Sequence, residues 1–301
     1  MRRVTLLVPA VLALAVACSP DGRSSPGPQP ASPADARPSP TDAAARLMAA
    51  PGATVAAGTA ATHLVATITG VPGRPDEIRM EGPGQVDFVG ARASSILDLS
   101  ELFSQPAAAA DARFETVLDG GVAYVRSPLL SSLVGVDTPW LRVDPAAAPN
   151  SSLAPLTQLA GSDHTAPLAL LAGVDPATVR EVGPEELDGE TNTHLAAVVD
   201  LRRAVEAAGP VTDPAGFERF VATLGGDRLE VDVYLDTSGR VRLLRYAHSL
   251  GPGAGTGRQS FELRYFDFGA AVAITVPPAE LVTDLTETSD VAGFGDRTGG
   301  R

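Results

Sequence analysis

The chain has 301 residues, enough for one large or two small domains with a sizeable hydrophobic core. Its formal net charge is −13, and all 23 basic side chains are arginines. Because the chain is acidic and has no basic stripe, nucleic acid is not expected as a partner. A single cysteine excludes an intramolecular disulfide.

The first 17 residues have the pattern of a secretory signal peptide. Arg2 and Arg3 precede an apolar run that ends at Ala17 and is too short for a stable transmembrane anchor. The order Leu14-Ala15-Val16-Ala17-Cys18 resembles a bacterial lipobox, although Ala15 stands where that motif usually has leucine. The resemblance implies that the Cys18 thiol receives a diacylglycerol and that the signal is cut before it. The alternative is an ordinary signal peptide whose cleavage leaves a free cysteine.

The composition divides the rest of the chain into three parts. Residues 18–45 are predicted to be the lipidated cysteine and a disordered tether rich in proline and serine. Residues 46–285 have the apolar periodicity of a folded domain, and residues 286–301 form a polar, glycine-rich tail that we expect to be disordered. This layout predicts a lipid-anchored protein on the extracellular face of the cell membrane, with the membrane as a partner.

The first half of the folded domain is predicted to be mostly extended. A short helix from Thr41 to about Ala50 opens it, and Ser127-Pro128 begins another helix that ends at Val134. The segment 94–103 is predicted to be a short helix or a loop because its apolar residues cluster. Strands are expected at 63–70, 85–89, 113–118, 122–126 and 140–143, with a hairpin turn at Asp119-Gly120-Gly121.

The middle of the chain is predicted to be more helical. Leucines at helical spacing predict helices at 152–160 and 166–173, and Asp175-Pro176 has the residue types of a helix start. Residues 184–189 are rich in turn formers and lead into a strand at 191–199. A helix at 200–208 precedes the best helix of the chain, 215–224, which Asp213-Pro214 caps and Gly225 ends.

The clearest pattern lies near the end of the chain. Apolar residues alternate with polar ones at 229–235, 240–248 and 261–265, separated by a turn at 236–239 and a glycine-rich loop at 251–257. These connections are too short for a parallel crossover, so the pattern predicts a three-stranded antiparallel meander. Its apolar face needs a surface to pack against.

The arrangement of these elements is similar to that of the actinobacterial envelope lipoproteins related to the LppX, LprG and LolA lipid carriers. The similar features include Val122-Ala-Tyr-Val-Arg-Ser-Pro128, Trp140-Leu-Arg-Val-Asp144 and Phe266-Asp-Phe-Gly269. The resemblance implies an α+β fold with a single strongly curved antiparallel β-sheet, a half-barrel, and helices packed on its concave side. It also implies an apolar cavity between sheet and helices that holds acyl chains.

Six residues on the apolar faces of the predicted strands are candidates for lining this cavity: Ile68, Phe88, Phe114, Tyr124, Val231 and Val233. The alternative is that these side chains form a dry core closed by the helices, which is the usual role of a buried strand face.

Patterns typical of enzymes are lacking in the sequence, so we expect no catalytic residue, no metal and no cofactor. Motifs of hydrolases and zinc proteases do not occur, and the loop 251–257 joins two strands where a phosphate-binding loop would begin a helix. The four histidines have no ligand spacing, and the acidic turn 185–190 lacks the regular spacing of a calcium loop.

Two functions of different classes remain. The first is a lipoprotein that binds a lipid or another hydrophobic molecule in an apolar cavity, in envelope lipid transport. The second is a non-catalytic interaction or sensor lipoprotein that binds a protein partner, as the regulators of the RseB type do. A cavity that is open and apolar favours the first, and a filled interior favours the second.

Overall fold

The computed structural model describes residues 40–102, 112–144, 165–208, 214–251 and 256–286. The signal peptide, Cys18, most of the tether, the predicted helix 152–160 and the C-terminal tail lie outside the described residues. Among the described residues no helix is both long enough and apolar enough to span a bilayer.

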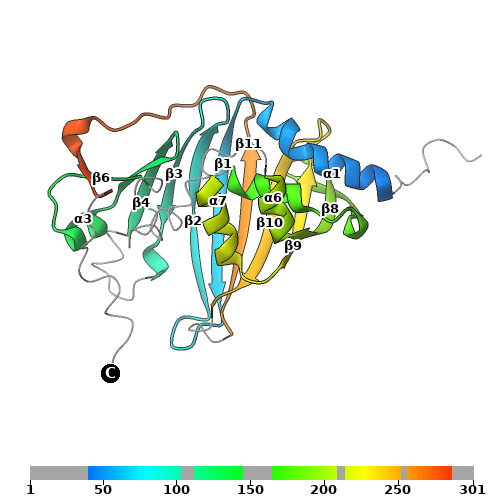
Figure 1. The fold of residues 1–301 in the computed structure, drawn as a ribbon, viewed down its shortest axis with the longest axis horizontal. Coiled ribbons are helices and arrows are strands. Elements are labelled where there is room, and N and C mark those ends of the chain that lie inside the picture. Colours follow the sequence, from blue (N-terminus) through cyan, green and yellow to red (C-terminus); the bar gives the residue numbers. More distant parts are fainter. Residues whose placement is uncertain (1–39, 103–111, 145–164, 209–213, 252–255, 287–301) are drawn as a thin grey trace, which may run out of the picture. The chain divides into compact units, whose positions relative to one another are not determined.

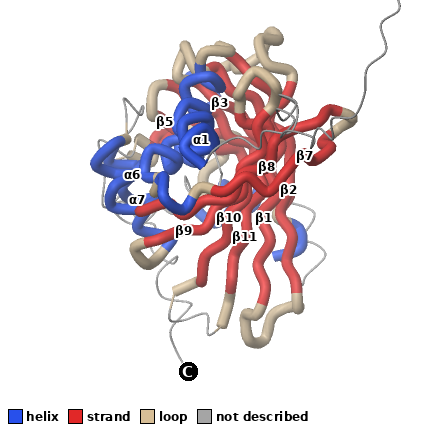
Figure 2. The backbone as a smooth tube through the Cα atoms, turned by 90° about the vertical axis from the view of Figure 1, so that its right-hand side faces the viewer, coloured by secondary structure: helices blue, strands red, loops and turns tan. Residues whose placement is uncertain are grey.

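The described residues form one open, curled sheet of twelve strands with a few helices, as the sequence predicts (Figures 1 and 2). The strand order is β12-β6-β5-β4-β3-β2-β1-β11-β10-β9-β8-β7. Every neighbouring pair is antiparallel except β12 and β6, which run parallel. The strands are β1 (Thr59–Thr69), β2 (Glu77–Asp87), β3 (Arg92–Asp98), β4 (Arg113–Asp119), β5 (Val122–Arg126), β6 (Trp140–Val143), β7 (Arg180–Leu187), β8 (Glu190–Asp200), β9 (Arg228–Leu235), β10 (Val241–Ser249), β11 (Arg258–Phe266) and β12 (Val282–Asp284).

The main helices lie against one face of the sheet, which we call the concave face (Figure 1). Side chains of α1, α6 and α7 share a hydrophobic core with the meander β9 to β11. The helices are α1 (Pro40–Val55), α3 (Pro128–Val134), α5 (Ala166–Leu170), α6 (Leu201–Ala207) and α7 (Pro214–Leu224), with short 3₁₀ turns η2 (Ser100–Leu102), η3 (Leu171–Gly173), η4 (Pro176–Thr178) and η6 (Ala279–Leu281).

Local signals of the sequence explain many of these boundaries. The meander β9 to β11 is confirmed, and so is the hairpin of β4 and β5, whose turn residues Gly120 and Gly121 both have positive φ. The Asp200 side chain accepts a hydrogen bond from the Arg203 N–H and caps α6. Ser127 caps α3 in the same way, with Pro128 in the first turn.

Two predictions of local structure are wrong in part. Residues 94–98 of the segment 94–103 belong to β3, which pairs with β2 and β4, and the buried residues of β3 alternate as Ala93, Ser95 and Leu97. The small size of Ala93 and Ser95 concealed this two-residue period. The 3₁₀ turn η2 at Ser100–Leu102 fits the predicted short helix. The predicted turn 184–189 belongs mostly to β7, which ends at Leu187. This strand is the exposed edge of the sheet, where charged residues are common, so its polar composition resembled a turn.

A glycine-proline-glycine sequence interrupts β2 in the middle of the sheet. Pro83 has no N–H to donate, and the pairing of β2 with β3 passes from Glu81–Asp98 directly to Gly84–Ser95. The backbone of β3 approaches Gly82 so closely that a Cβ atom there would lie 1.7 Å from the Ile96 carbonyl oxygen. Only glycine fits this position.

Helix α1 continues beyond its predicted end near Ala50 and is joined to the sheet by one buried hydroxyl. The Thr54 hydroxyl donates to the Ala50 carbonyl at 2.8 Å and accepts a hydrogen bond from the Val241 N–H at 2.9 Å. Thr54 has no exposed surface, so water cannot replace it as the acceptor.

We therefore expect Thr54→Val to lower the free energy of unfolding by about 1–3 kcal/mol, because it leaves the Val241 N–H buried without an acceptor. Thr54→Ser keeps the hydroxyl and serves as the control. Urea denaturation measures both variants. Equal stability of the valine variant and the wild type would contradict this role of Thr54.

Candidate ligand-binding site

The concave face carries two hydrophobic clusters. The first cluster is covered by helices and includes, from the sheet, Leu195, Val231, Val233, Leu244 and Tyr265, and from the helices, Leu47, Leu171, Leu201, Phe217 and Leu224. The second cluster includes, from β1 to β6, Ala66, Met80, Leu97, Phe114, Val125 and Leu141, and, from α3, Leu130. Side chains from the helices therefore cover the concave face around β8 and β9.

Two half-buried residues contact both clusters. Leu64 on β1 and Phe261 on β11 pack against the first and the second cluster, and Phe261 pairs with Ala66 across the strands. The Phe261 ring stacks on Tyr246 with a centroid distance of 5.0 Å and on His248 at 6.0 Å. Large apolar side chains that stay partly uncovered between two buried clusters are the groups that a hydrophobic ligand would cover.

The concave face of the sheet is uncharged around this point. The strand register places the following residues of β1 to β5 on it, none of them charged: Ala60, Thr62, Leu64, Ala66, Ile68, Ile78, Met80, Gly82, Gly84, Val86, Ala93, Ser95, Leu97, Phe114, Thr116, Leu118, Ala123 and Val125. Burial raises the pKa of the neighbouring Tyr246, so its phenol stays neutral. A face of this kind suits an uncharged, hydrophobic ligand.

His248 borders the same face and is held in its neutral form. Burial lowers the pKa of its imidazole, with a smaller effect in the same direction from Arg258, while the Ser249 carbonyl opposes the shift. The unfolded chain therefore binds a proton at higher pH than the folded chain does.

From this difference we expect the free energy of unfolding to fall as the pH decreases from about 7 toward the folded pKa of His248. His248→Gln should make this part of the decrease smaller, because glutamine does not titrate. His63→Gln is the control, since His63 lies on the opposite face of β1. Chemical denaturation at pH 7 and pH 5 measures the effect, and an unchanged pH dependence in the His248 variant would refute it.

Five of the six candidate lining residues lie on the concave side. Val231, Val233 and Phe88 belong to or pack against the first cluster, and Phe114 and Ile68 belong to or pack against the second. Val231 and Val233 are fully covered by protein, whereas Ile68 and Phe88 are half-buried. Whether any of them lines a cavity stays a prediction.

Tyr124 requires a correction, because it lies on the opposite, convex face. Its neighbours Ala123 and Val125 face the concave side, and the Tyr124 ring packs with Val117, Trp140 and Ile274 in a separate small cluster. Because side chains alternate along β5, Val125 and Tyr124 cannot face the same side of the sheet. The sequence showed the alternation but not which of the two apolar sets points inward.

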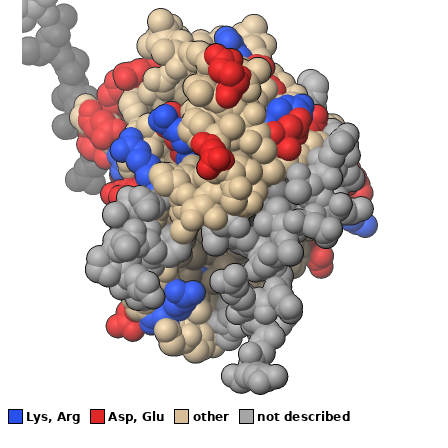
Figure 3. All heavy atoms as spheres, turned by 90° about the vertical axis from the view of Figure 1, so that its left-hand side faces the viewer, with Lys and Arg blue, Asp and Glu red and all other residues tan. Residues whose placement is uncertain are grey.

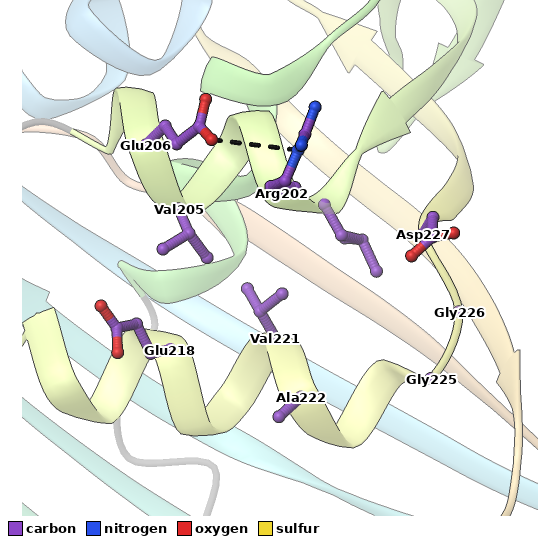
Figure 4. Close-up of a pocket in the computed structure, with 10 residues that line it drawn as sticks. Arg202, Val205, Glu206, Glu218, Val221, Ala222, Gly225, Gly226 and Asp227 are labelled. Carbon is purple, nitrogen blue, oxygen red and sulfur yellow. Dashed lines mark ion pairs between the residues drawn. The ribbon is translucent and has the colours of Figure 1, made fainter.

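A groove of about 510 Å³ runs between α6 and α7 (Figure 4). Val205 and Val221 point toward each other across it, and charged side chains stand along its rim, including the exposed Arg202–Glu206 pair. The groove contains none of the six candidate residues, and its lining also includes Glu218 and Asp227. It is therefore distinct from the apolar cavity that the sequence predicts.

Charged residues gather away from the concave face. On the convex face His194 Nε2 lies 2.7 Å from Asp232 Oδ1, the His194 ring stacks on Tyr234 at 4.3 Å, and Arg245 donates to the Tyr234 hydroxyl at 2.9 Å. The described surface in Figure 3 carries arginines and acidic residues side by side rather than one-sign patches. Within the described ranges no group of three or more His, Cys, Asp or Glu side chains has the arrangement of a metal site.

Sequence reasoning missed Leu64 and several polar residues of the concave face, and it did not single out Phe261 from the other strand residues. The sequence does not show how strands far apart in the chain pair. Phe261 pairs with Ala66, and Leu64 with Leu263, because β1 and β11 are neighbours in the sheet although nearly 200 residues separate them. The local signal that could have found Leu64 is its position in the series Leu64, Ala66 and Ile68, which share one face of the strand.

No protein-family model and no curated protein matches the sequence. Among solved structures, the chain is similar to the lipoprotein LppX from Mycobacterium tuberculosis, with 15% identity, 76% of this chain and 98% of that chain covered, and a TM-score of 0.38. It is also similar to LprF from Mycobacterium bovis, with 15% identity, 80% and 99% covered, and a TM-score of 0.42. LppX is one of the lipoproteins that the sequence resembles.

A third similar structure is the MucA/MucB complex of Pseudomonas aeruginosa, with 15% identity and a TM-score of 0.32. The match covers 79% of this chain and 61% of that chain. The similar structures thus include lipoproteins and a protein–protein complex.

Proposed function

We propose that this chain is a lipoprotein, anchored to the membrane through Cys18, that binds a lipid or another hydrophobic molecule on the concave side of its sheet and acts in envelope lipid transport. The observation that carries the proposal is the uncharged concave face on which Leu64 and Phe261 stay half-buried between two hydrophobic clusters. The chain is proposed to bind its ligand without catalysing a reaction.

The energetics of this face are sufficient for the role. Burial of each methylene contributes about 0.8 kcal/mol, and a micromolar dissociation constant corresponds to about 8.2 kcal/mol. A chain of about ten buried methylenes reaches that value before the costs of ordering, so a longer acyl chain leaves a surplus. Neither a metal nor a charged pair is needed for this kind of binding.

A second candidate function is partner binding by a protein of the RseB type. The dense packing of the first cluster, in which Leu195, Val233 and Leu235 have no exposed surface, favours a filled interior. The open groove between α6 and α7, with its apolar floor and charged rim, suits a peptide segment rather than a lipid.

Native mass spectrometry of the full chain, purified from its own envelope, separates the two candidates. The lipid-binding function predicts one lipid per protein, recovered by organic extraction and replaced when a fluorescent fatty acid is added. A protein that carries no lipid and takes up no fatty acid would refute lipid binding and leave the partner-binding candidate.

A further inference from the structure

The groove between α6 and α7 has an apolar floor that is only partly covered. Leu201 is buried beneath it in the first cluster, whereas Val205 and Val221 pack against this cluster and stay half-buried. The two valines point into the groove from opposite helices (Figure 4). At one end, a Cβ atom on Gly225 or Gly226 would meet nothing within 4 Å among the described residues. The groove therefore has room for a ligand beside exposed apolar surface.

The rim of the groove carries an excess of negative charge. Glu206, Glu218 and Asp227 line it, and Arg202 is the one basic residue among the described lining residues. Arg202 Nε lies 3.9 Å from Glu206 Oε1, so the excess comes from Glu218 and Asp227. Glu206 and Glu218 stand at one end of the groove and Asp227 at the other (Figure 4). This combination of an apolar floor and acidic ends is complementary to a cationic ligand with an apolar part.

The two acidic ends are separated by a distance that suits a peptide. From Glu218 to Gly225 the groove follows about two turns of α7, which is roughly 10 Å at the usual helical rise. A single small cation cannot approach both ends. In a helical peptide, two cationic side chains about two turns apart share a face with an apolar side chain on the turn between them.

The same charges disfavour other occupants. Anionic lipid headgroups and a second copy of this chain, whose net charge is −13, would both bring negative charge to an acidic rim. An uncharged acyl chain would cover the two valines but leave the excess negative charge of the rim uncompensated.

We propose that the α6–α7 groove binds a basic amphipathic peptide segment of a partner protein. An aliphatic side chain of the segment packs between Val205 and Val221, and a lysine or arginine side chain lies at each end of the groove, beside Glu218 and beside Asp227. The groove contains none of the six candidate lining residues, so this site does not depend on the proposed lipid binding. It gives the partner-binding candidate a defined location.

A pair of synthetic peptides tests the site. Both have about twelve residues with leucine at helical spacing, and one carries lysine at the flanking positions where the other carries glutamate. Isothermal titration calorimetry of the full chain measures binding at low salt and at about 0.5 M salt, where exposed charges are screened. We expect the lysine peptide to bind with an affinity that falls as the salt concentration rises, and the glutamate peptide not to bind measurably.

Two double variants test the contribution of the rim. Glu218→Gln/Asp227→Asn removes the excess carboxylates and should weaken binding of the lysine peptide by about fivefold. Asp76→Asn/Glu77→Gln is the matched control, because it removes the same charge from exposed residues outside the groove, and it should bind like the wild type. All four residues are exposed, so the substitutions leave the core intact.

A second pair of variants tests the space in the groove. Ala222 is exposed and lines the groove, so Ala222→Arg places a long cationic side chain in it and should abolish binding of the lysine peptide. Thr223→Arg adds the same charge at the next exposed position, outside the lining, and should keep most of the binding.

The location is read from a lysine peptide in which one leucine is replaced by a photoreactive residue. We expect its adducts on α6 and α7. Adducts elsewhere, equal binding of the two peptides, no binding of either, or equal effects of the groove and control variants overturns the proposal. A dimer of the chain that Ala222→Arg dissociates would show that a second copy covers the groove, and it would overturn the proposal as well. Each of these outcomes leaves lipid binding on the concave face intact.

Discussion

Replacement of Gly82 with alanine is expected to destabilise the domain strongly. The new Cβ atom would lie 1.7 Å from the Ile96 carbonyl oxygen and 2.8 Å from its carbon, and both atoms belong to the backbone of β3. Backbone atoms cannot rotate away as a flexible side chain does, so β2 and β3 have to separate. We expect a loss of about 3 kcal/mol or more in the free energy of unfolding.

The control for this variant is Gly52→Ala in α1, where a Cβ atom would meet nothing within 4 Å. Alanine favours a helix over glycine by about 1 kcal/mol, so this variant should be neutral or more stable. Denaturant unfolding of both proteins gives the comparison. A Gly82→Ala protein as stable as the wild type would show that the close approach of β3 to β2 is absent in solution.

Replacement of Cys18 with serine is expected to move the protein from the membrane to the soluble fraction. The prediction follows from the proposed lipid anchor, since serine does not accept the thioether-linked diacylglycerol. Loss of two acyl chains removes most of the membrane affinity, because each buried methylene contributes about 0.8 kcal/mol. Ultracentrifugation of lysed cells followed by immunoblotting measures the distribution.

Ser19→Ala is the matched control and should remain with the membranes, because the lipidated residue is intact. A Cys18→Ser protein that still sediments with the membranes would contradict the anchor. It would leave the alternative of an ordinary signal peptide with a free cysteine.

The sheet was largely predictable where its strands are amphipathic and joined by short turns. In β9 to β11 apolar residues alternate with polar ones, apart from an irregularity in the pairing between Val241 and Leu243. Asp236 to Gly239 form a turn in which the Asp236 side chain accepts hydrogen bonds from the Ser238 and Arg240 N–H groups. Edge strand β7 was not predictable in this way, because an exposed strand has no buried face to produce alternation.

The candidate site was less predictable than the fold, for a physical reason. A strand pattern shows that residues alternate between two faces, but the sides on which Tyr124 and Phe114 fall depend on the curl of the whole sheet. The polar residues Thr62, Ser95 and Thr116 lie on the concave face because of the way β1 to β4 pair, and none of them carries a local signal of this. Threonine is common in strands and glycine weakens them, but neither residue shows which face of a sheet it takes.

Photo-crosslinking shows directly whether a lipid binds between the two hydrophobic clusters. A fatty acid with a diazirine on its chain is added to the full protein, irradiated and located by peptide mass spectrometry. We expect adducts on β1 (Thr59–Thr69) and β11 (Arg258–Phe266), the strands of Leu64 and Phe261. Adducts confined to the α6–α7 groove or to the convex face, or no adducts at all, would contradict it.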